Sequence, residues 1–265
     1  MTMQLLTLYR RRLRLLAGNP RELIVPLATP ILFAVVIGPA LKKALGSFNP
    51  RVDYLTFVSI ATVVLLVPLN ALFSGLSVMG DREHGALREL LAAPVPRWYP
   101  PLANVMATLT ITALQVSVLM VAAVARGARF SDGTSGILWF VGSVALLTTI
   151  YASLAEVMAF KLASEQEYIG NVPAIAIVPW FFAGSLFPIS VLPKGLAIFA
   201  KILPGTHALA LMRHGLTSGP ADGLRAIWGA HAGTGSAIAS FGIVVAFTVM
   251  LLATSAKVFR RSAVV

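Results

Sequence analysis

The charged side chains that could take part in chemistry or in contacts with a partner are concentrated in one short interval, residues 79–99, between two long apolar runs. Asp81 has the kind of side chain that helix N-caps favour, and Arg82 and Glu83 follow it. Two prolines then stop the helix. The sequence therefore predicts a short charged helix over residues 81–93, and such a helix suits docking rather than bond making.

Three leucines form an apolar ridge along this predicted helix. Leu87, Leu90 and Leu91 recur at helical spacing, while Arg88 points away from them. Water is a poor environment for such a ridge, so either the lipid interface or a partner protein must cover it. The pattern by itself leaves both interpretations open.

The residue types that build familiar active sites are absent or wrongly spaced. The sequence has no cysteine, so it can form neither a disulfide nor a thiolate metal site. Its four histidines show no HExxH-type spacing, and we expect no metal site. The sequence also has no GxxxxGK[ST] phosphate-binding loop and no Ser/His/Asp arrangement that would support a hydrolase. We therefore expect no cofactor in this chain.

Composition identifies the class of protein. Of the 265 residues, 57% are hydrophobic and only 12% are charged, whereas a soluble domain has about 25% charged residues. The formal net charge is +11, which in a soluble protein would suggest nucleic acid. Here most basic residues flank apolar runs, so anionic lipid head groups are the expected partner instead.

Six apolar runs are each long enough to cross the roughly 30 Å hydrocarbon core of a bilayer as a helix. They are residues 23–41, 54–79, 101–125, 137–160, 169–187 and 238–256. The chain is therefore predicted to be an all-α integral membrane protein, with six transmembrane helices in one domain that covers residues 1–265.

The segment before the first span, residues 3–17, predicts an amphipathic helix that lies in the membrane interface. Leu6, Tyr9 and Leu13 share one helical stripe, and most of the arginines at 10–14 lie off it, towards lipid phosphates. A signal peptide is the competing interpretation, but no small-residue cleavage site closes the next run. In the termini and short loops, Lys and Arg are more than twice as numerous on the side of the termini and the 80–99 loop, so that side is predicted to be cytoplasmic. The four basic residues of the long segment 188–236 lie on the other side, and long segments count for less.

Four polar residues lie inside the predicted spans. Asn70, Asn104 and Gln115 could line a pathway, although such residues more often form hydrogen bonds between helices, the interpretation we favour. Glu156 is the only acidic residue well inside a run. We expect it either to pair with the arginines at 10–14 or Arg21, or to form a polar site at the inner mouth of a pathway.

The stretch between the last two spans is built differently. Residues 196–203 and 207–216 are too short to cross a bilayer and too apolar for a solvated loop, and prolines separate them. We expect short re-entrant or interfacial helices here.

The order of these parts resembles the permease subunit of type-2 ABC exporters, a family that includes daunorubicin-resistance and nodulation-factor permeases. A basic interfacial helix precedes six spans, and two motif blocks come in order along the chain. The first is residues 81–95 (DREHGALRELLAAPV), between spans two and three. The second runs from residues 182–188 (FAGSLFP) through Leu192-Pro193 to residues 203–213 (LPGTHALALMR). The resemblance covers nearly the whole chain.

The resemblance implies that residues 81–93, which we name the coupling segment, form a cytoplasmic coupling helix seated in a groove of an ATPase. The ATPase contacts that it implies are Asp81, Arg82, Glu83, Gly85, Leu87, Arg88, Leu90 and Leu91. It likewise implies that residues 188–216 form external re-entrant helices. Their motif residues are Phe187, Pro188, Pro193, Pro204 and Arg213.

The resemblance also implies a function. The chain would be the transmembrane subunit of an ATP-driven exporter for a hydrophobic drug, a lipid or a lipid-linked molecule. Two cytoplasmic ATPase subunits would bind ATP and Mg, and a second copy or a close homologue would complete the pathway in a bacterial inner membrane. The alternative is a stand-alone ion-coupled transporter or channel, which needs paired intramembrane charges, and only Glu156 offers itself.

Overall fold

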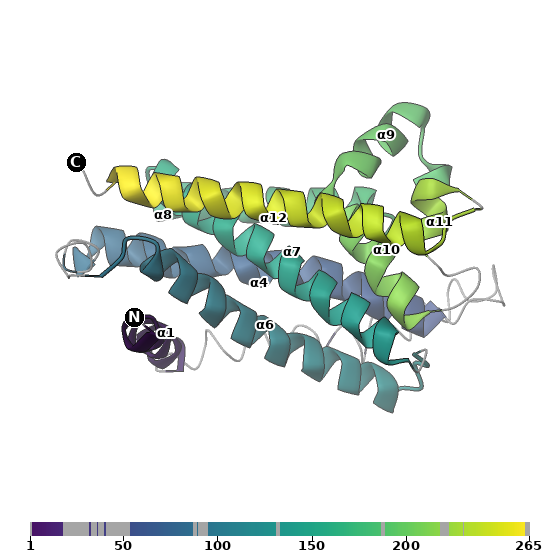
Figure 1. Cartoon of the computed structure of the whole chain (residues 1–265), viewed down its shortest axis with the longest axis horizontal. Helices are drawn as coiled ribbons and strands as arrows, with labels where there is room; N and C mark the ends of the chain where they lie inside the picture. The colour runs from purple at the N-terminus through teal and green to yellow at the C-terminus, as the bar shows by residue number, and fades with distance from the viewer. Residues whose placement is uncertain are drawn as a thin grey trace.

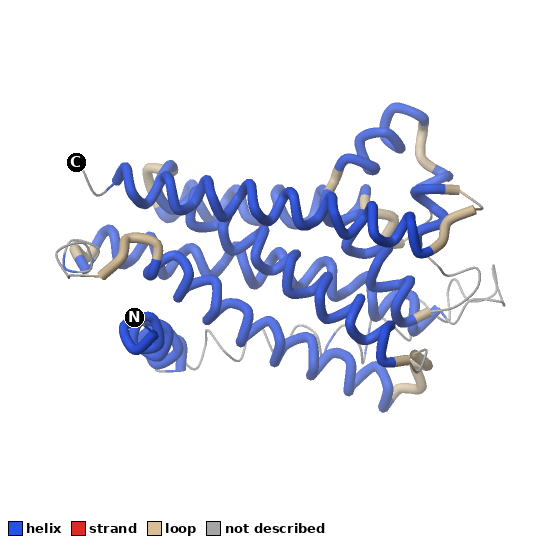
Figure 2. The backbone as a smooth tube through the Cα atoms, viewed as in Figure 1, coloured by secondary structure: helices blue, strands red, loops and turns tan. Residues whose placement is uncertain are grey.

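A computed structural model describes most of the chain. It covers residues 2–17, 54–86, 95–130, 133–186, 189–217, 223–229 and 231–262, with the single positions 32, 36, 40 and 89. The predicted first span, residues 23–41, therefore lies almost entirely outside the described residues. Within these ranges every regular element is a helix, and Figure 2 shows no strand.

The described helices follow the order of the apolar runs. They are α1 (Thr2–Ala17), α4 (Tyr54–Glu83), α6 (Tyr99–Ala125), α7 (Thr134–Lys161), α8 (Glu165–Phe182), the 3-10 turn η2 (Ile189–Val191), α9 (Lys194–Ile202), α10 (Pro204–Leu216), α11 (Gly223–Trp228) and α12 (Thr234–Ser262). Four of them, α4, α6, α7 and α12, are long and apolar enough to cross a membrane. The number rises to five if α9 and α10, which meet at a bend of 79°, form one broken span.

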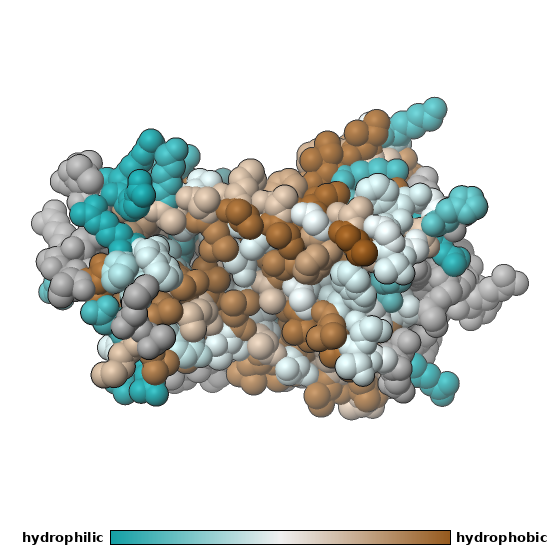
Figure 3. All heavy atoms as spheres, viewed as in Figure 1, coloured by the Kyte–Doolittle hydropathy of each residue, from teal (hydrophilic) through white to brown (hydrophobic). Residues whose placement is uncertain are grey.

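The long helices lie side by side, and α1 crosses them at one end. In Figure 1, the helices α4, α6, α7 and α12 run roughly along the long, horizontal axis of the molecule. Helix α1 is seen almost down its own axis, near the end of α4 and the start of α6. We call this the α1 end of the bundle and the opposite one the far end. Figure 3 shows apolar side chains in the middle of the bundle and hydrophilic ones gathered at its ends, as expected for a protein that spans a bilayer.

Helix α8 differs from the predicted fifth span, residues 169–187. It begins earlier, at Glu165, because Ser164 accepts a hydrogen bond from the Glu167 backbone N–H at 3.2 Å, and the Glu167 carboxylate accepts one from the Ala163 N–H at 3.0 Å. This polar cap resembles a capping box. Helix α8 is not among the helices that are long and apolar enough to cross a membrane, and its first turn carries Glu165 and Glu167.

The aromatic residues at the end of α8 also differ from a membrane-interface belt, which is what such a cluster usually predicts. The Trp180 side chain is buried, and its indole N–H donates to the Ala61 carbonyl oxygen of α4 at 2.8 Å. Only Phe181 beside it is exposed. The tryptophan therefore joins two helices, because a buried indole N–H needs an acceptor.

Two glycines bring the backbones of α7 and α10 into contact at the far end. A Cβ atom added at Gly136 would overlap the Gly215 carbonyl oxygen, and one added at Gly215 would overlap the Gly136 carbonyl oxygen. Small residues permit such close helix contacts in membranes. The contact fixes the last turn of α10 against the first turn of α7.

Substituting Gly136→Ala should lower the thermal unfolding midpoint in mild detergent, because overpacking of this kind costs about 1–3 kcal/mol. Gly142→Ala is the matched control on the same helix, since its new Cβ would have only the Phe241 ring within contact distance, at 3.8 Å. Equal midpoints for the two variants would contradict the packing described for α7 and α10.

Candidate functional site

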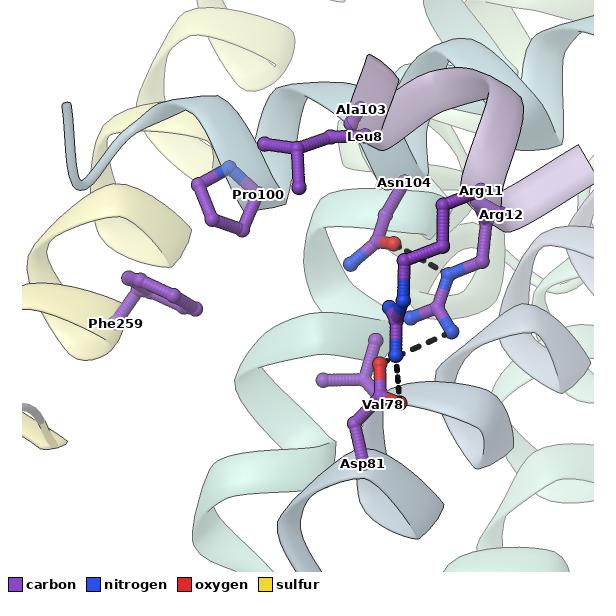
Figure 4. A pocket seen from close by; sticks show the side chains of 9 residues that line it. All are labelled: Leu8, Arg11, Arg12, Val78, Asp81, Pro100, Ala103, Asn104 and Phe259. Atoms are coloured by element: carbon purple, nitrogen blue, oxygen red, sulfur yellow. Dashed lines mark hydrogen bonds and ion pairs between the residues drawn. The ribbon is translucent and has the colours of Figure 1, made fainter. Parts of the chain in front are cut away.

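A cluster of charged and polar side chains joins α1 to the ends of α4 and α6. Arg12 Nη1 lies 3.2 Å from Asp81 Oδ2, and Arg11 Nη2 lies 3.3 Å from Asp81 Oδ1. The Arg12 Nε–H donates to Asn104 Oδ1 at 2.6 Å. Figure 4 shows both guanidinium groups converging on one carboxylate. We call Arg11, Arg12, Asp81, Asn104 and Glu156 the polar cluster.

The two arginines of the cluster differ in burial. The Arg12 side chain is only 7% exposed, whereas the Arg11 side chain is 39% exposed. Burial lowers the pKa of the Arg12 guanidinium from its usual value, and the nearby Asp81 carboxylate opposes that shift. Arg12 is therefore the buried charge that most needs its partners.

Glu156 extends the polar cluster to α12. The Ser255 hydroxyl donates a short hydrogen bond to Glu156 Oε2. The Asn104 side chain and the positive charge of Arg12 also interact electrostatically with this carboxyl. Glu156 Oε1 is buried and has no hydrogen-bond partner among the described residues. The carboxylate therefore ties α7 to α12.

The arginines at 10–14 were expected to pair with Glu156, and this is only partly right. Arg12 acts on Glu156 from a distance, but it forms its direct ion pair with Asp81. Arg12 pairs with Asp81 rather than with Glu156 because Asp81 lies in the last turn of α4, close to α1. Arg21, the other candidate, lies outside the described residues.

The prediction that Asp81 caps the coupling segment is wrong. Asp81 lies inside α4, because backbone hydrogen bonds continue the helix as far as His84, whose N–H donates to the Gly80 carbonyl. The neighbouring Arg82 side chain also turns towards the bundle. Its Nη1 donates to the carbonyl oxygens of Ala159 at 2.8 Å and Leu162 at 3.2 Å, at the C-terminal end of α7.

Gly85 separates this anchored helix end from the rest of the coupling segment. Its φ of +78° lies in the left-handed region, as is usual for the glycine that follows a helix. Glu83 and His84, just before it, are exposed, and so is Glu89. Four other predicted ATPase contacts, Leu87, Arg88, Leu90 and Leu91, lie outside the described residues.

The candidate pathway residues make contacts between helices. Asn70 Nδ2 donates to Thr112 Oγ1 at 2.8 Å and so links α4 to α6. Asn104 links α6 to α1 through Arg12, and Gln115 is buried on α6. For Asn70 and Asn104, the interpretation as hydrogen bonds between helices is confirmed.

Arg213 anchors the bent pair α9–α10 to the end of α8. Its Nη1 and Nη2 donate to the carbonyl oxygens of Gly184 at 2.8 Å and Ser185 at 3.0 Å. The guanidinium also stacks 3.5 Å above the Phe57 ring of α4. Pro193 and Pro204 stand at the starts of α9 and α10, where proline is tolerated. Phe187 and Pro188 fall outside the described residues.

Sequence reasoning did not single out Ser255 or Tyr168. The Tyr168 hydroxyl is buried and donates to the Leu72 carbonyl oxygen of α4 at 2.6 Å. A serine or tyrosine in an apolar run gives no signal of its distant partner. In the described part of the chain, no group of three or more His, Cys, Asp or Glu side chains could hold a metal ion.

Comparisons with known proteins place these features in a family. Residues 3–217 match the family model described as ABC-2 type transporter. The putative transport permease ycf38 of Porphyra purpurea is 26% identical over 198 residues, which cover 74% of this chain and 68% of the relative. The probable doxorubicin resistance ABC transporter permease protein DrrC of Mycobacterium tuberculosis is 28% identical over 217 residues, which cover 78% of this chain and 75% of the relative.

The polar cluster predicts that substituting its two arginines lowers the free energy of unfolding by unequal amounts. Removing one partner of a buried ion pair costs about 3–5 kcal/mol, whereas a solvent-exposed pair contributes about 1 kcal/mol or less. Arg12→Gln should therefore lower the free energy of unfolding in detergent much more than Arg11→Gln, although both arginines pair with Asp81. A larger loss for Arg11→Gln would show that α1 is not held as described.

Proposed function

The chain belongs to the ABC-2 type transporter family, and from this premise we propose that it is the membrane subunit of an exporter driven by a separate ATPase. The family match confirms the resemblance inferred from the motif blocks. The 265 residues contain no GxxxxGK[ST] loop, so we assign the binding of ATP and Mg to partner ATPase subunits.

We place the transport pathway between two permease subunits, either two copies or one copy and a close homologue. The support is the packing of α4, the central helix, whose Ile60, Val67 and Leu72 side chains are completely buried. They belong to a core in which side chains of α4, α7 and α10 pack directly against one another. A bundle that is filled in this way leaves the surface between subunits as the place for a substrate.

The end of α4 supports a mechanism for coupling. Asp81 joins this end to α1, and Arg82 joins it to the last turn of α7. Beyond them, the left-handed Gly85 permits a change of chain direction before the rest of the coupling segment, residues 86–93. A force that an ATPase exerts on the coupling segment would be transmitted to the end of α4, which is held by α1 and α7. The bundle would then shift between inward-open and outward-open states as packed helices.

This mechanism revises the roles of the predicted ATPase contacts. Asp81 and Arg82 would transmit the movement, because their side chains are already engaged within the chain. The exposed Glu83 and Glu89 would meet the rim of the ATPase groove. Leu87, Leu90 and Leu91 would fill the groove, as their helical spacing in the sequence suggests.

We assign the α1 end to the cytoplasm of a bacterial cell, with both termini on that side of the inner membrane. The last turn of α12 carries Arg260 and Arg261 at this end. Arg10 and Arg14 are exposed on α1. An excess of basic residues at one membrane face is typical of the cytoplasmic side.

We propose a hydrophobic drug or a lipid-like molecule as the substrate. The support is that one relative is named for doxorubicin resistance. A stand-alone ion-coupled transporter remains the second candidate, because Glu156 has one buried oxygen without a partner among the described residues. Family membership favours the ATP-driven exporter over it.

Replacing two groove anchors together tests the proposed function. The double variant Leu90→Ala with Leu91→Ala should lose co-purification with the ATPase and lose transport, while the permease itself stays folded. Each buried anchor at an interface contributes about 2 kcal/mol or more, and exposed positions contribute far less.

The matched control is Leu114→Ala with Val121→Ala, which truncates two exposed apolar side chains of α6 away from the coupling segment. This control should retain both the ATPase and transport. If the double variant at 90 and 91 behaves like the control, the coupling segment is not the site of ATPase docking.

A further inference from the structure

Helices α9 and α10 meet at a bend of 79°, but only α10 is part of the core. Its Leu209, Leu211 and Met212 side chains are at most 1% exposed. In α9, whose nine residues are all described, Ala200 is the only buried residue. Figure 1 shows α9 standing out from the side of the bundle near the far end. Helix α9 therefore presents a surface that the rest of the described chain does not cover.

The uncovered surface of α9 is apolar. Four exposed side chains, which we name the apolar face of α9, have exposed fractions between 41% and 63%: Leu196, Ile198, Phe199 and Ile202. Figure 3 shows apolar side chains gathered over this helix. Water is a poor environment for such a face. A helix of nine residues is about 14 Å long and cannot cross a hydrocarbon core of about 30 Å, so the face suits a helix that lies along the membrane surface.

Two lysines border the apolar face of α9. Lys194 and Lys201 are exposed and seven residues apart, so they lie on the same side of the helix, next to Ile198. From this edge their ammonium groups can reach lipid phosphates while their stems follow the apolar face. Residues 168–221 contain no Asp or Glu. This stretch of the chain therefore carries only positive charge, which favours an anionic partner.

Two contacts fix the direction in which the apolar face points. The Nε2–H of the buried His207, on α10, donates to the Lys201 carbonyl oxygen at 2.8 Å. The Phe199 ring packs edge-to-face on the Phe182 ring of α8, with the ring centroids 5.7 Å apart. These contacts join the C-terminal half of α9 to two helices of the bundle. The apolar face is therefore held outward before any partner binds, which lowers the entropy cost of binding.

A second copy of the chain is the other partner that could cover this face. Symmetric dimers pair the same surface of both subunits, so the lysines of one α9 would face those of the other. Residues 168–221 supply no acidic side chain to compensate them, and like charges in such a contact repel each other. A lipid surface instead supplies acyl chains for the apolar side chains and phosphates for the lysines.

We propose that α9 is a membrane anchor for the far end of the bundle. Its apolar face lies among the acyl chains of the leaflet at that end, and Lys194 and Lys201 bind the phosphates of anionic phospholipids there. The anchor keeps the bent pair α9–α10 at a fixed depth in the membrane. It requires neither the ATPase nor a transported substrate, so it stands or falls independently of the proposed function.

The anchor can be tested in nanodiscs, where a fluorophore on a single cysteine reports contact with spin-labelled lipids. The sequence has no cysteine, so Ile198→Cys, at an exposed position, gives a unique label. We expect spin-labelled phosphatidylglycerol to quench this label about fivefold more efficiently than spin-labelled phosphatidylcholine, because one basic residue near the surface attracts an anionic lipid by about 1 kcal/mol. Val249→Cys, exposed midway along α12, is the matched control and should be quenched equally by both lipids.

Two double variants assign the lipid preference to the lysines. Lys194→Gln with Lys201→Gln should reduce the preference at position 198 to that at position 249, whereas Lys194→Arg with Lys201→Arg should keep it. Equal quenching by both lipids, or a preference that survives in the glutamine variant, would overturn the binding of anionic lipid. An absence of quenching at position 198 would overturn the anchor, and a disulfide between two copies of Ile198→Cys would then identify a second copy as the partner. A thermal unfolding scan checks that each variant is folded.

Discussion

The ion pair between Arg12 and Asp81 is the constraint on which this arrangement depends. Arg12 is 5% exposed, and an unpaired charge buried to that degree would cost several kcal/mol. The pair can form only if α1 lies across the last turn of α4. The hydrogen bond from Arg12 to Asn104 then joins the second turn of α6 to the same guanidinium. One buried guanidinium thus orients three helices.

The same constraint explains how a local push could move the bundle. Asp81 and Arg82 are adjacent in the chain, but they face different neighbours, α1 and α7. The end of α4 is therefore held from two sides, while Gly85 leaves the following segment free to take another direction. At the far end, Arg213 and the Gly136–Gly215 contact hold α10 against α8 and α7. Rigid ends and a tightly packed core favour movement of helices as units.

Much of this fold could be predicted because apolar runs and helix signals are local. The runs at 54–79 and 101–125 correspond to α4 and α6, although α4 continues to Glu83. The side chain of Asp81 suggested a cap because Asp favours that position, but the backbone hydrogen bonds of α4 continue past it, and its carboxylate pairs with Arg12. Glu156 and Ser255 are 99 residues apart, and no spacing rule relates them. Arg213 was located by its motif, but its acceptors in Gly184 and Ser185 depend on how α8 ends.

The orientation of the bundle decides whether the α1 end faces the ATPase. A photo-crosslinking amino acid placed at position 84, which is exposed at the end of α4, should cross-link to the co-expressed ATPase in membrane vesicles. The same residue placed at position 194, exposed at the start of α9, should not. Cross-links to the ATPase from position 194, with none from position 84, would contradict both the orientation and the coupling mechanism.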